Sequence, residues 1–236
     1  MRSRQFIVVT LALTLSACSV RSISNSGPPG DSYNNAYRGE LNELDVLVPD
    51  NGEPVTEARI QAVLSTGGTV HADLGKSLLV IQSGAFSPDP QMIAALEPVF
   101  HVVPFSGVPS TDRDGLARRL RLAAAEGGYR QILCYWGQLE AAQQNEATKV
   151  ISWVPIVGLI VPDEIQQMRI RLKAAIIDVE TGRWRFVMPP PIEDERFSAR
   201  INRRTADQDQ VTRLKTSGYA SLARALIEDA TQVSAQ

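Results

Sequence analysis

Cysteine is scarce in this chain, which contains only Cys18 and Cys134 among its 236 residues. Because the amino-terminal pattern described below commits Cys18 to another role, Cys134 has no partner and we expect no intramolecular disulfide. Cys134 stands in the apolar stretch QILCYW, which favours a buried, inert thiol over a reactive one.

An excess of basic residues is also lacking. The chain has 24 Lys and Arg against 26 Asp and Glu, a formal net charge of −2. Residues 1–17 carry two of the arginines and no acid, so without them 22 basic residues face 26 acidic ones and the charge is −4. Because nucleic acids are bound through clustered positive charge, we expect no nucleic-acid partner.

No apolar run is long enough for a membrane-spanning helix, which needs roughly 20 residues. The run from Val150 to Val161 is short and is interrupted by Pro155 and Gly158. We interpret it as a β-strand. The motifs of common active sites are missing too: there is no Gly-x-Ser-x-Gly elbow.

The amino terminus has the layout of a secretory signal. Arg2 and Arg4 precede the apolar stretch FIVVTLALTL, and the small residues Ser16 and Ala17 follow. We therefore expect residues 1–17 to be a signal peptide that lies outside the folded domain.

The sequence Leu15-Ser16-Ala17-Cys18 resembles the lipobox of bacterial lipoproteins. In that family the cysteine receives a diacylglyceryl group, becomes the first residue and is acylated again with a fatty acid such as palmitate. The resemblance implies lipid attachment at Cys18, and Ser19 in place of aspartate implies the outer membrane, with the domain in the periplasm. Two or three acyl chains anchor stably, at ~0.8 kcal/mol per buried CH₂. An ordinary signal peptide followed by cysteine is the alternative.

Ser19–Arg38 is rich in Ser, Asn, Gly and Pro, which predicts a disordered tether with a reach of about 25 Å. Together with Cys18 it forms the segment 18–38, and we expect a single domain over 39–232, with 77–229 best supported. Glu53–Thr66 is predicted to be a helix whose apolar stripe is Ile60, Val63 and Leu64.

The remainder alternates between apolar runs and amphipathic segments. Strands are expected at 77–83, 99–105, 131–136, 150–161, 168–179 and 184–188, and helices at 91–96, from a cap at Thr111 or Asp112 to residue 126, and at about 209–229. The helix capped at 111 or 112 should bury Leu116, Leu120, Ala123 and Ala124 and expose its arginines, Arg121 among them. Residues 192–208 read as a polar loop. The predicted fold is α/β (α+β), one mixed sheet in the order β-α-β-α-β-β-β-α with a C-terminal helix packed on it.

The clearest hairpin follows Met168. Side chains alternate from there to Val179, the turn Glu180-Thr181-Gly182 follows, and the return strand begins at Trp184. This pattern D-x-x-T-G-x-W, with YRQILCYWG after an alanine-rich helix, resembles a periplasmic α/β domain. That domain is shared by the curli-export lipoprotein, the amino-terminal domain of TolB and the lipoprotein activators of penicillin-binding proteins. The resemblance covers 77–229 and implies a protein-binding envelope domain with no catalytic centre or cofactor.

Two groups of residues are candidate partner or membrane contacts. Arg169, Arg171 and Lys173 form a cationic row opposite the apolar face, which is either a solvated sheet face or a docking surface for an anionic partner. Trp153, Val157 and Leu159 make the run 150–161 more apolar than a half-exposed strand requires. Either a helix covers that run, or it meets a partner or membrane.

The sequence gives weaker support for a catalytic site or a metal site. Ser83 and Ser87 lie at the carboxyl end of the first strand, where α/β sheets place ligands, so a hydrolase with a site near Ser83–Ser87 stays an alternative. His71 with Asp73 and the isolated His101 do not complete a metal site, which needs three or four ligands. We expect a non-catalytic, lipid-anchored envelope protein that binds an unidentified partner or itself. An oligomeric outer-membrane export pore like that of the curli system is the first alternative, and the hydrolase is the second.

Overall fold

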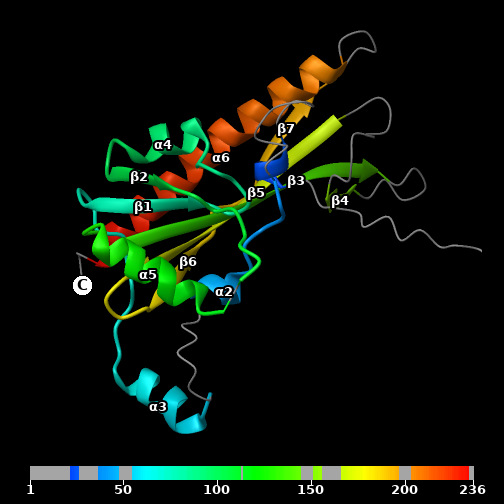
Figure 1. Ribbon diagram of the computed structural model, residues 1–236. Coiled ribbons are helices and arrows are strands. Elements are labelled where there is room, and N and C mark those ends of the chain that lie inside the picture. Colours follow the sequence, from blue (N-terminus) through cyan, green and yellow to red (C-terminus); the bar gives the residue numbers. More distant parts are fainter. Residues whose placement is uncertain are drawn as a thin grey trace, which may run out of the picture.

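The computed structural model describes residues 22–26, 37–47, 55–112, 114–144, 151–155, 166–196 and 203–233. Cys18, Val157 and Leu159 lie outside these residues. The side chains of 143, 144, 151–155, 166, 195, 196, 203–207, 232 and 233 are also outside the description. One mixed sheet with helices on both faces forms the body of this part of the chain (Figure 1).

The sheet contains seven strands in the described residues. They are β1 (Ser77–Gln82), β2 (His101–Phe105), β3 (Gln131–Gln144), β4 (Ile151–Pro155), β5 (Gln166–Asp178), β6 (Trp184–Val187) and β7 (Ile192–Arg196). The central order is β2-β1-β3-β5-β6, with β1 parallel to both of its neighbours and β5 antiparallel to β3 and β6. β4 pairs with the carboxyl end of β3 (Glu140–Gln144), and β7 pairs with the amino end of β5 (Gln166–Ile170).

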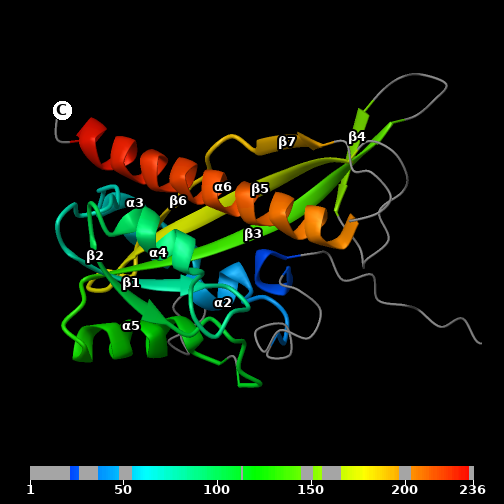
Figure 2. The same cartoon turned by 90° about the horizontal axis from the view of Figure 1, so that it is seen from above.

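The helical elements cover this sheet from both sides. They are η1 (Ile23–Asn25), α2 (Glu43–Leu47), α3 (Glu57–Ser65), α4 (Pro90–Leu96), α5 (Leu116–Glu126) and α6 (Arg203–Val233). α4 and α6 lie on one face, and α5 and α2 on the other, while α3 stands apart from the body (Figures 1 and 2). This arrangement confirms the predicted fold class and the C-terminal helix packed on the sheet.

Two hydrophobic cores follow from the alternation of side chains along the strands. Met168, Ile170 and Leu172 belong to the core beneath α4 and α6. Ala175 and Ile177 belong to the opposite core beneath α5 and α2. The hairpin from β5 to β6 is confirmed by four Cα pairs, Ala174↔Val187 through Ile177↔Trp184.

Part of the predicted tether is folded. Residues 22–26 form η1 and its caps, with Ile23 only 1% exposed and Ser22 bridged to Gln138 of β3. On the edge of β3 that Ser22 meets, β1 pairs as far as Tyr135 and β4 pairs from Glu140 onward. η1 lies beside the stretch between these two pairings. The prediction of disorder across 19–38 is therefore wrong for residues 22–26, because composition does not reveal an open strand edge.

Other differences concern element ends. α5 begins at Leu116 behind the N-cap Gly115, whose φ of 64° is a conformation that glycine adopts readily, so neither Thr111 nor Asp112 is the cap. Arg121 is half-buried rather than fully exposed, and its guanidinium donates to the Val179 and Glu180 carbonyls at 2.8 Å each. Ala123 is exposed rather than buried.

The segment predicted as a polar loop over 192–208 contains β7 and the start of α6, which extends over a longer range than expected. The apolar stripe of α3 is exposed in the structure, at 44% for Ile60, 56% for Val63 and 67% for Leu64. Arg183 fastens this helix to the body through the carbonyls of Val63 and Gly68, at 3.1 Å each.

Candidate functional site

The predicted cationic row exists on one face of β5, but carboxylates neutralise it. Arg169 pairs with Glu140, and Arg171 Nε lies 3.5 Å from the same carboxylate. Lys173 pairs with Glu43 of α2. The three cations therefore form ion pairs within the described fold. Trp153 lies opposite Ala142 in the β3–β4 pairing, and its side chain is outside the description.

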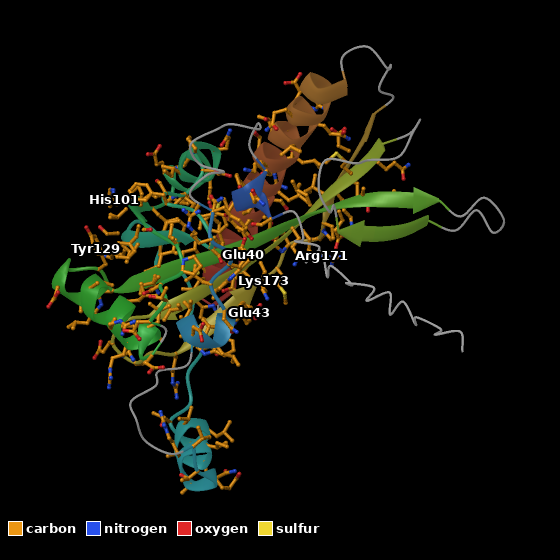
Figure 3. All side chains as sticks on the ribbon, turned by 45° about the vertical axis from the view of Figure 1, so that its right-hand side comes forward. Glu40, Glu43, His101, Tyr129, Arg171 and Lys173 are labelled. Carbon is orange, nitrogen blue, oxygen red and sulfur yellow. The ribbon has the colours of Figure 1, made fainter. Side chains whose placement is uncertain are left out.

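A groove opens beside Lys173, between α2 and β6, with a volume of about 830 Å³. We call it the α2–β6 groove. Its lining comprises Ser22, Tyr37, Glu40, Leu41, Asn42, Glu43, Leu44, Leu47, Trp136, Gly137, Gln138, Arg171, Leu172, Lys173, Trp184, Phe186, Met188 and Pro189. Figure 3 shows Glu40, Glu43, Arg171 and Lys173 gathered in this region, with His101 and Tyr129 far from it.

Aromatic rings form one wall of the groove. Phe186 packs edge-on against Trp184 and Trp136, with ring centroids 5.1 and 6.5 Å away. The Lys173 ammonium lies 5.1 Å from the Phe186 centroid and 5.8 Å from that of Trp136, which are cation–π distances. The indole N–H of Trp136 donates to the Leu41 carbonyl at 2.9 Å, so the ring is held in place. This wall is rigid before any ligand arrives.

The groove also holds a carboxylate with spare hydrogen-bonding capacity. Burial raises the pKa of Glu40 above 4.5, although hydrogen bonds from Ser22, Ser83 and Tyr37 act in the opposite direction. Its Oε2 atom is buried and has no hydrogen-bond partner in the described structure. Burial, with a further contribution from Glu40, raises the pKa of Tyr37 to about 12, so this phenol is neutral. Oε2 is therefore an unsatisfied acceptor that is enclosed by the fold and not exposed to the groove.

Apolar side chains stand exposed at the rim of the groove. Leu44 and Met188 are each 66% exposed and Trp184 is 42% exposed. All three line the same groove, and they come from α2, from β6 and from the residue that follows β6. Grouped apolar exposure of this kind is typical of a contact surface.

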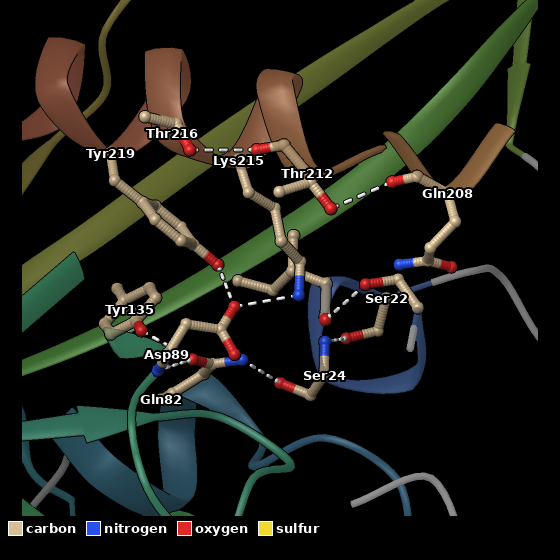
Figure 4. Close-up of polar contacts among 12 residues, drawn as sticks. Ser22, Ser24, Gln82, Asp89, Tyr135, Gln208, Thr212, Lys215, Thr216 and Tyr219 are labelled. Carbon is tan, nitrogen blue, oxygen red and sulfur yellow. Dashed lines mark hydrogen bonds and ion pairs between the residues drawn. The ribbon is translucent and has the colours of Figure 1, made fainter. Parts of the chain in front are cut away.

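The carboxyl end of β1 holds a buried polar network (Figure 4). Gln82 is its centre: its Oε1 accepts from Tyr135 at 2.6 Å, and its Nε2 donates to Ser24 at 2.9 Å. The Asp89 carboxylate accepts from the Tyr219 hydroxyl and lies 2.8 Å from Lys215 Nζ. This network ties α6 and η1 to the sheet.

Ser83 is fully buried next to this network. Its hydroxyl accepts the Leu41 N–H at 2.8 Å, and its carbonyl accepts from Ser24 at 2.6 Å. Neither histidine lies beside it: His71 Nδ1 is 3.0 Å from Asp229 of α6, and His101 is exposed on the edge strand β2. The contacts of Ser83 are those of a residue that positions backbone.

The histidines and acids of the described residues form no cluster of three or more that could hold a metal ion. His71 faces Asp229, which also pairs with Arg185 at 2.6 Å. The neighbouring Asp73 is held through its backbone N–H by Gln131 at 2.8 Å. The pair His71 and Asp73 thus joins α6 and β3 to one loop.

Sequence reasoning missed most of the groove. It placed Trp184 and Phe186 on a strand, where their spacing of two puts both on one face. Trp184 pairs with Ile177 across the hairpin, and Ile177 shares a face of β5 with Lys173, so this spacing could have assigned both rings to the side of Lys173. No local signal indicated Glu40 or Glu43, because they reach the site through a loop and a five-residue helix that pack across the sheet.

None of the helices described is both long and apolar enough to cross a bilayer. Comparison with curated proteins gives no match. One family model, described as YafT bacterial lipoprotein, matches residues 42–229 and so includes every described strand, the helices α2 to α5 and most of α6. Because the match covers far more than half of the 236 residues, the chain belongs to the YafT bacterial lipoprotein family.

Proposed function

We propose that this protein is a non-catalytic, lipid-anchored component of the bacterial envelope whose α/β domain binds another protein through the α2–β6 groove. Cys18 carries the acyl chains, and the domain lies in the periplasm at the outer membrane. The single observation that carries the proposal is the exposed rim of Leu44, Trp184 and Met188 beside a rigid aromatic wall. Tryptophan in such a setting is typical of residues that dominate binding energy.

The groove also specifies some chemistry of the partner. An apolar side chain fits between the rim residues and Phe186, and a hydrogen-bond donor fits the Glu43 carboxylate, which lines the groove and is 42% exposed. We therefore infer a protein segment that presents an apolar side chain next to a basic or amide donor.

The surroundings of Ser83 support a binding role over a hydrolytic one. Its hydroxyl is fully buried and accepts a backbone N–H, and both histidines face other parts of the fold. A nucleophilic serine needs a neighbouring base and access to substrate. The Glu40 carboxylate is hydrogen-bonded to Ser83, but the serine is 0% exposed and so lacks that access.

Site-specific photo-crosslinking in cells tests the proposal. A benzoylphenylalanine at Met188 should yield a discrete protein adduct, identified by mass spectrometry. The same group at Leu122, which is 58% exposed on α5 outside the groove, is the matched control and should yield none. Trp184→Ala in the Met188 background should reduce the adduct about tenfold. Equal adducts at both positions, or none at Met188, would contradict the proposal.

One observation favours self-association as a second candidate. β3 and β5 run beyond the body of the domain and carry the short strands β4 and β7 (Figure 1). Extra hairpins build the oligomeric pore of the curli-export protein, which the chain resembles in topology. Sedimentation of the acylated protein in detergent separates the candidates, since a monomer argues against assembly and a ring supports it.

A further inference from the structure

We propose that η1 is a docked anchor segment that holds the α2–β6 groove at the membrane surface, so that the partner of the groove is a protein presented at that same surface. The inference rests on the proposed function and on acylation of Cys18. It concerns the distance of the groove from the membrane. Partner binding alone does not fix that distance.

η1 is fastened to the sheet by several independent contacts. Ser22 bridges to Gln138 on β3, and Ile23 is 1% exposed in the core beneath α6. The Ser24 hydroxyl accepts from Gln82 at 2.9 Å and donates to the Ser83 carbonyl at 2.6 Å. Residues 22–26 are therefore part of the folded body, although the composition of 19–38 predicted a tether.

The remaining link to the anchor is short. Ser22 is four residues from Cys18 in the sequence. A fully extended chain spans at most ~3.3–3.6 Å per residue, so Ser22 lies within about 14 Å of the acylated residue. A free tether as far as Tyr37 would span up to about 65 Å on the same basis. Docking of η1 thus removes most of the freedom that the composition of 19–38 suggests.

This short link places the groove itself, because Ser22 is one of the residues that line it. The Ser22 end of the groove therefore lies within about 14 Å of Cys18. Trp184 at the rim lies opposite Ile177, six residues along β5 from Arg171, the partner of Gln138 beside Ser22, which adds at most roughly 20 Å. The groove as a whole is therefore held close to the membrane surface. A protein that stays deeper in the periplasm is out of reach, whereas a membrane-embedded or lipid-anchored protein is at the right depth.

The shape and charge of the groove favour a protein over lipid as its occupant. The site is concave, and Glu40 and Glu43 lie inside it. Filling it with acyl chains would bury the Lys173–Glu43 ion pair against hydrocarbon, which is costly even when the charges are paired. A protein segment can present polar groups to this pair beside its apolar side chain.

Fluorescence quenching in vesicles tests the position of the groove without any partner. The acylated protein is reconstituted in phosphatidylcholine vesicles that contain either headgroup-nitroxide lipid or lipid brominated deep in the acyl chains. The signal of Trp184 is isolated by subtracting that of Trp184→Phe. We expect quenching by the headgroup nitroxide and little by bromine. No quenching by either probe would overturn the short link, and strong quenching by bromine would make lipid the occupant.

Lengthening the link tests its role. Twenty Gly and Ser residues inserted between Ser19 and Val20 extend the reach beyond the headgroups without touching the folded residues. The headgroup quenching should disappear, and the adduct formed at Met188 should fall about tenfold. The same insertion after Gln236 is the control and should change neither. If the insertion leaves both signals unchanged, the inference fails. If quenching follows the prediction but no adduct forms in any variant, the proposed function fails instead.

Discussion

The side chain of Ile23 fills the space that a side chain at position 137 would need. A Cβ on Gly137 would lie 2.7 Å from Ile23 Cγ2 and 2.6 Å from Leu172 Cδ2. The glycine therefore permits η1 to lie directly on β3. This contact joins the segment that follows Cys18 to the central strand of the sheet.

Gly137→Ala should destabilise the domain by about 1–3 kcal/mol, because the added methyl group overpacks a filled site. Urea unfolding followed by circular dichroism measures the loss. In an Ile23→Ala background the same substitution should cost less, since part of the space is then empty. Additive costs would mean that the two residues do not compete for this space.

Leu120→Ala should cost roughly 2–5 kcal/mol, because Leu120 is 9% exposed in the core between α5 and the sheet. Leu122→Ala on the same helix is the control, since Leu122 is 58% exposed, and should change the free energy of unfolding by less than about 0.5 kcal/mol. Similar losses in the two variants would mean that the helix faces are assigned wrongly.

The Lys173–Glu43 pair should contribute little to stability despite its place in the groove. The side chains are 30% and 42% exposed, and pairs of this kind couple by about 0.2–1 kcal/mol. A double-mutant cycle with Lys173→Met and Glu43→Gln measures the coupling, which should shrink further as salt is raised. A coupling above about 2 kcal/mol, insensitive to salt, would contradict this expectation.

Glu40 should make the domain less stable as the pH rises above 4.5. Burial raises the pKa of this carboxyl in the folded protein, so the folded state holds the proton more tightly than the unfolded state does. The resulting stabilisation is present below the unfolded pKa and is lost as the pH rises through the folded pKa. Urea unfolding across this range should show the loss.

Glu40→Gln isolates this effect, because the amide does not titrate. Its stability should vary less with pH than that of the native protein above pH 4.5. Glu180→Gln, at an exposed site far along the hairpin, is the control and should follow the native protein. Identical pH profiles for the native protein and Glu40→Gln would show that Glu40 is not the group responsible.

Cys18→Ser should release the protein from membranes or leave it unprocessed, because the serine cannot carry the thioether-linked lipid. Membrane fractionation and metabolic labelling with a radioactive fatty acid measure the outcome. Cys134→Ser, at the other and fully buried cysteine, should keep both the label and the membrane fraction. A label that persists in Cys18→Ser would overturn the anchor assignment.

The hairpin in the second half of the fold could be predicted because the patterns that indicate it lie within a short stretch of sequence. From Met168 to Val179 the side chains alternate, and Gly182 supplies the positive φ of the turn, so the hairpin and its two faces could be predicted. The first strand was equally clear, since residues 78–81 are a continuous apolar run and both faces of the strand are covered there.

Pairings between distant segments could not be read in this way. β7 is mostly polar, so its sequence does not indicate a strand. It pairs with Gln166–Ile170, the part of β5 that lies beyond the stretch paired with β6. The stripe of α3 has helical spacing, yet spacing says nothing about what, if anything, covers it. The groove joins α2, β3, β5 and β6, whose proximity arises only when the sheet forms.

The sequence by itself determined the mixed sheet and the inner face of each central strand, because these depend on residues close together in the chain. Only the tertiary structure decided that residues 22–26 dock on β3 and that Glu40 lies beside an aromatic wall. The physical reason is that burial and strand-edge pairing depend on distant segments meeting, which local composition does not encode.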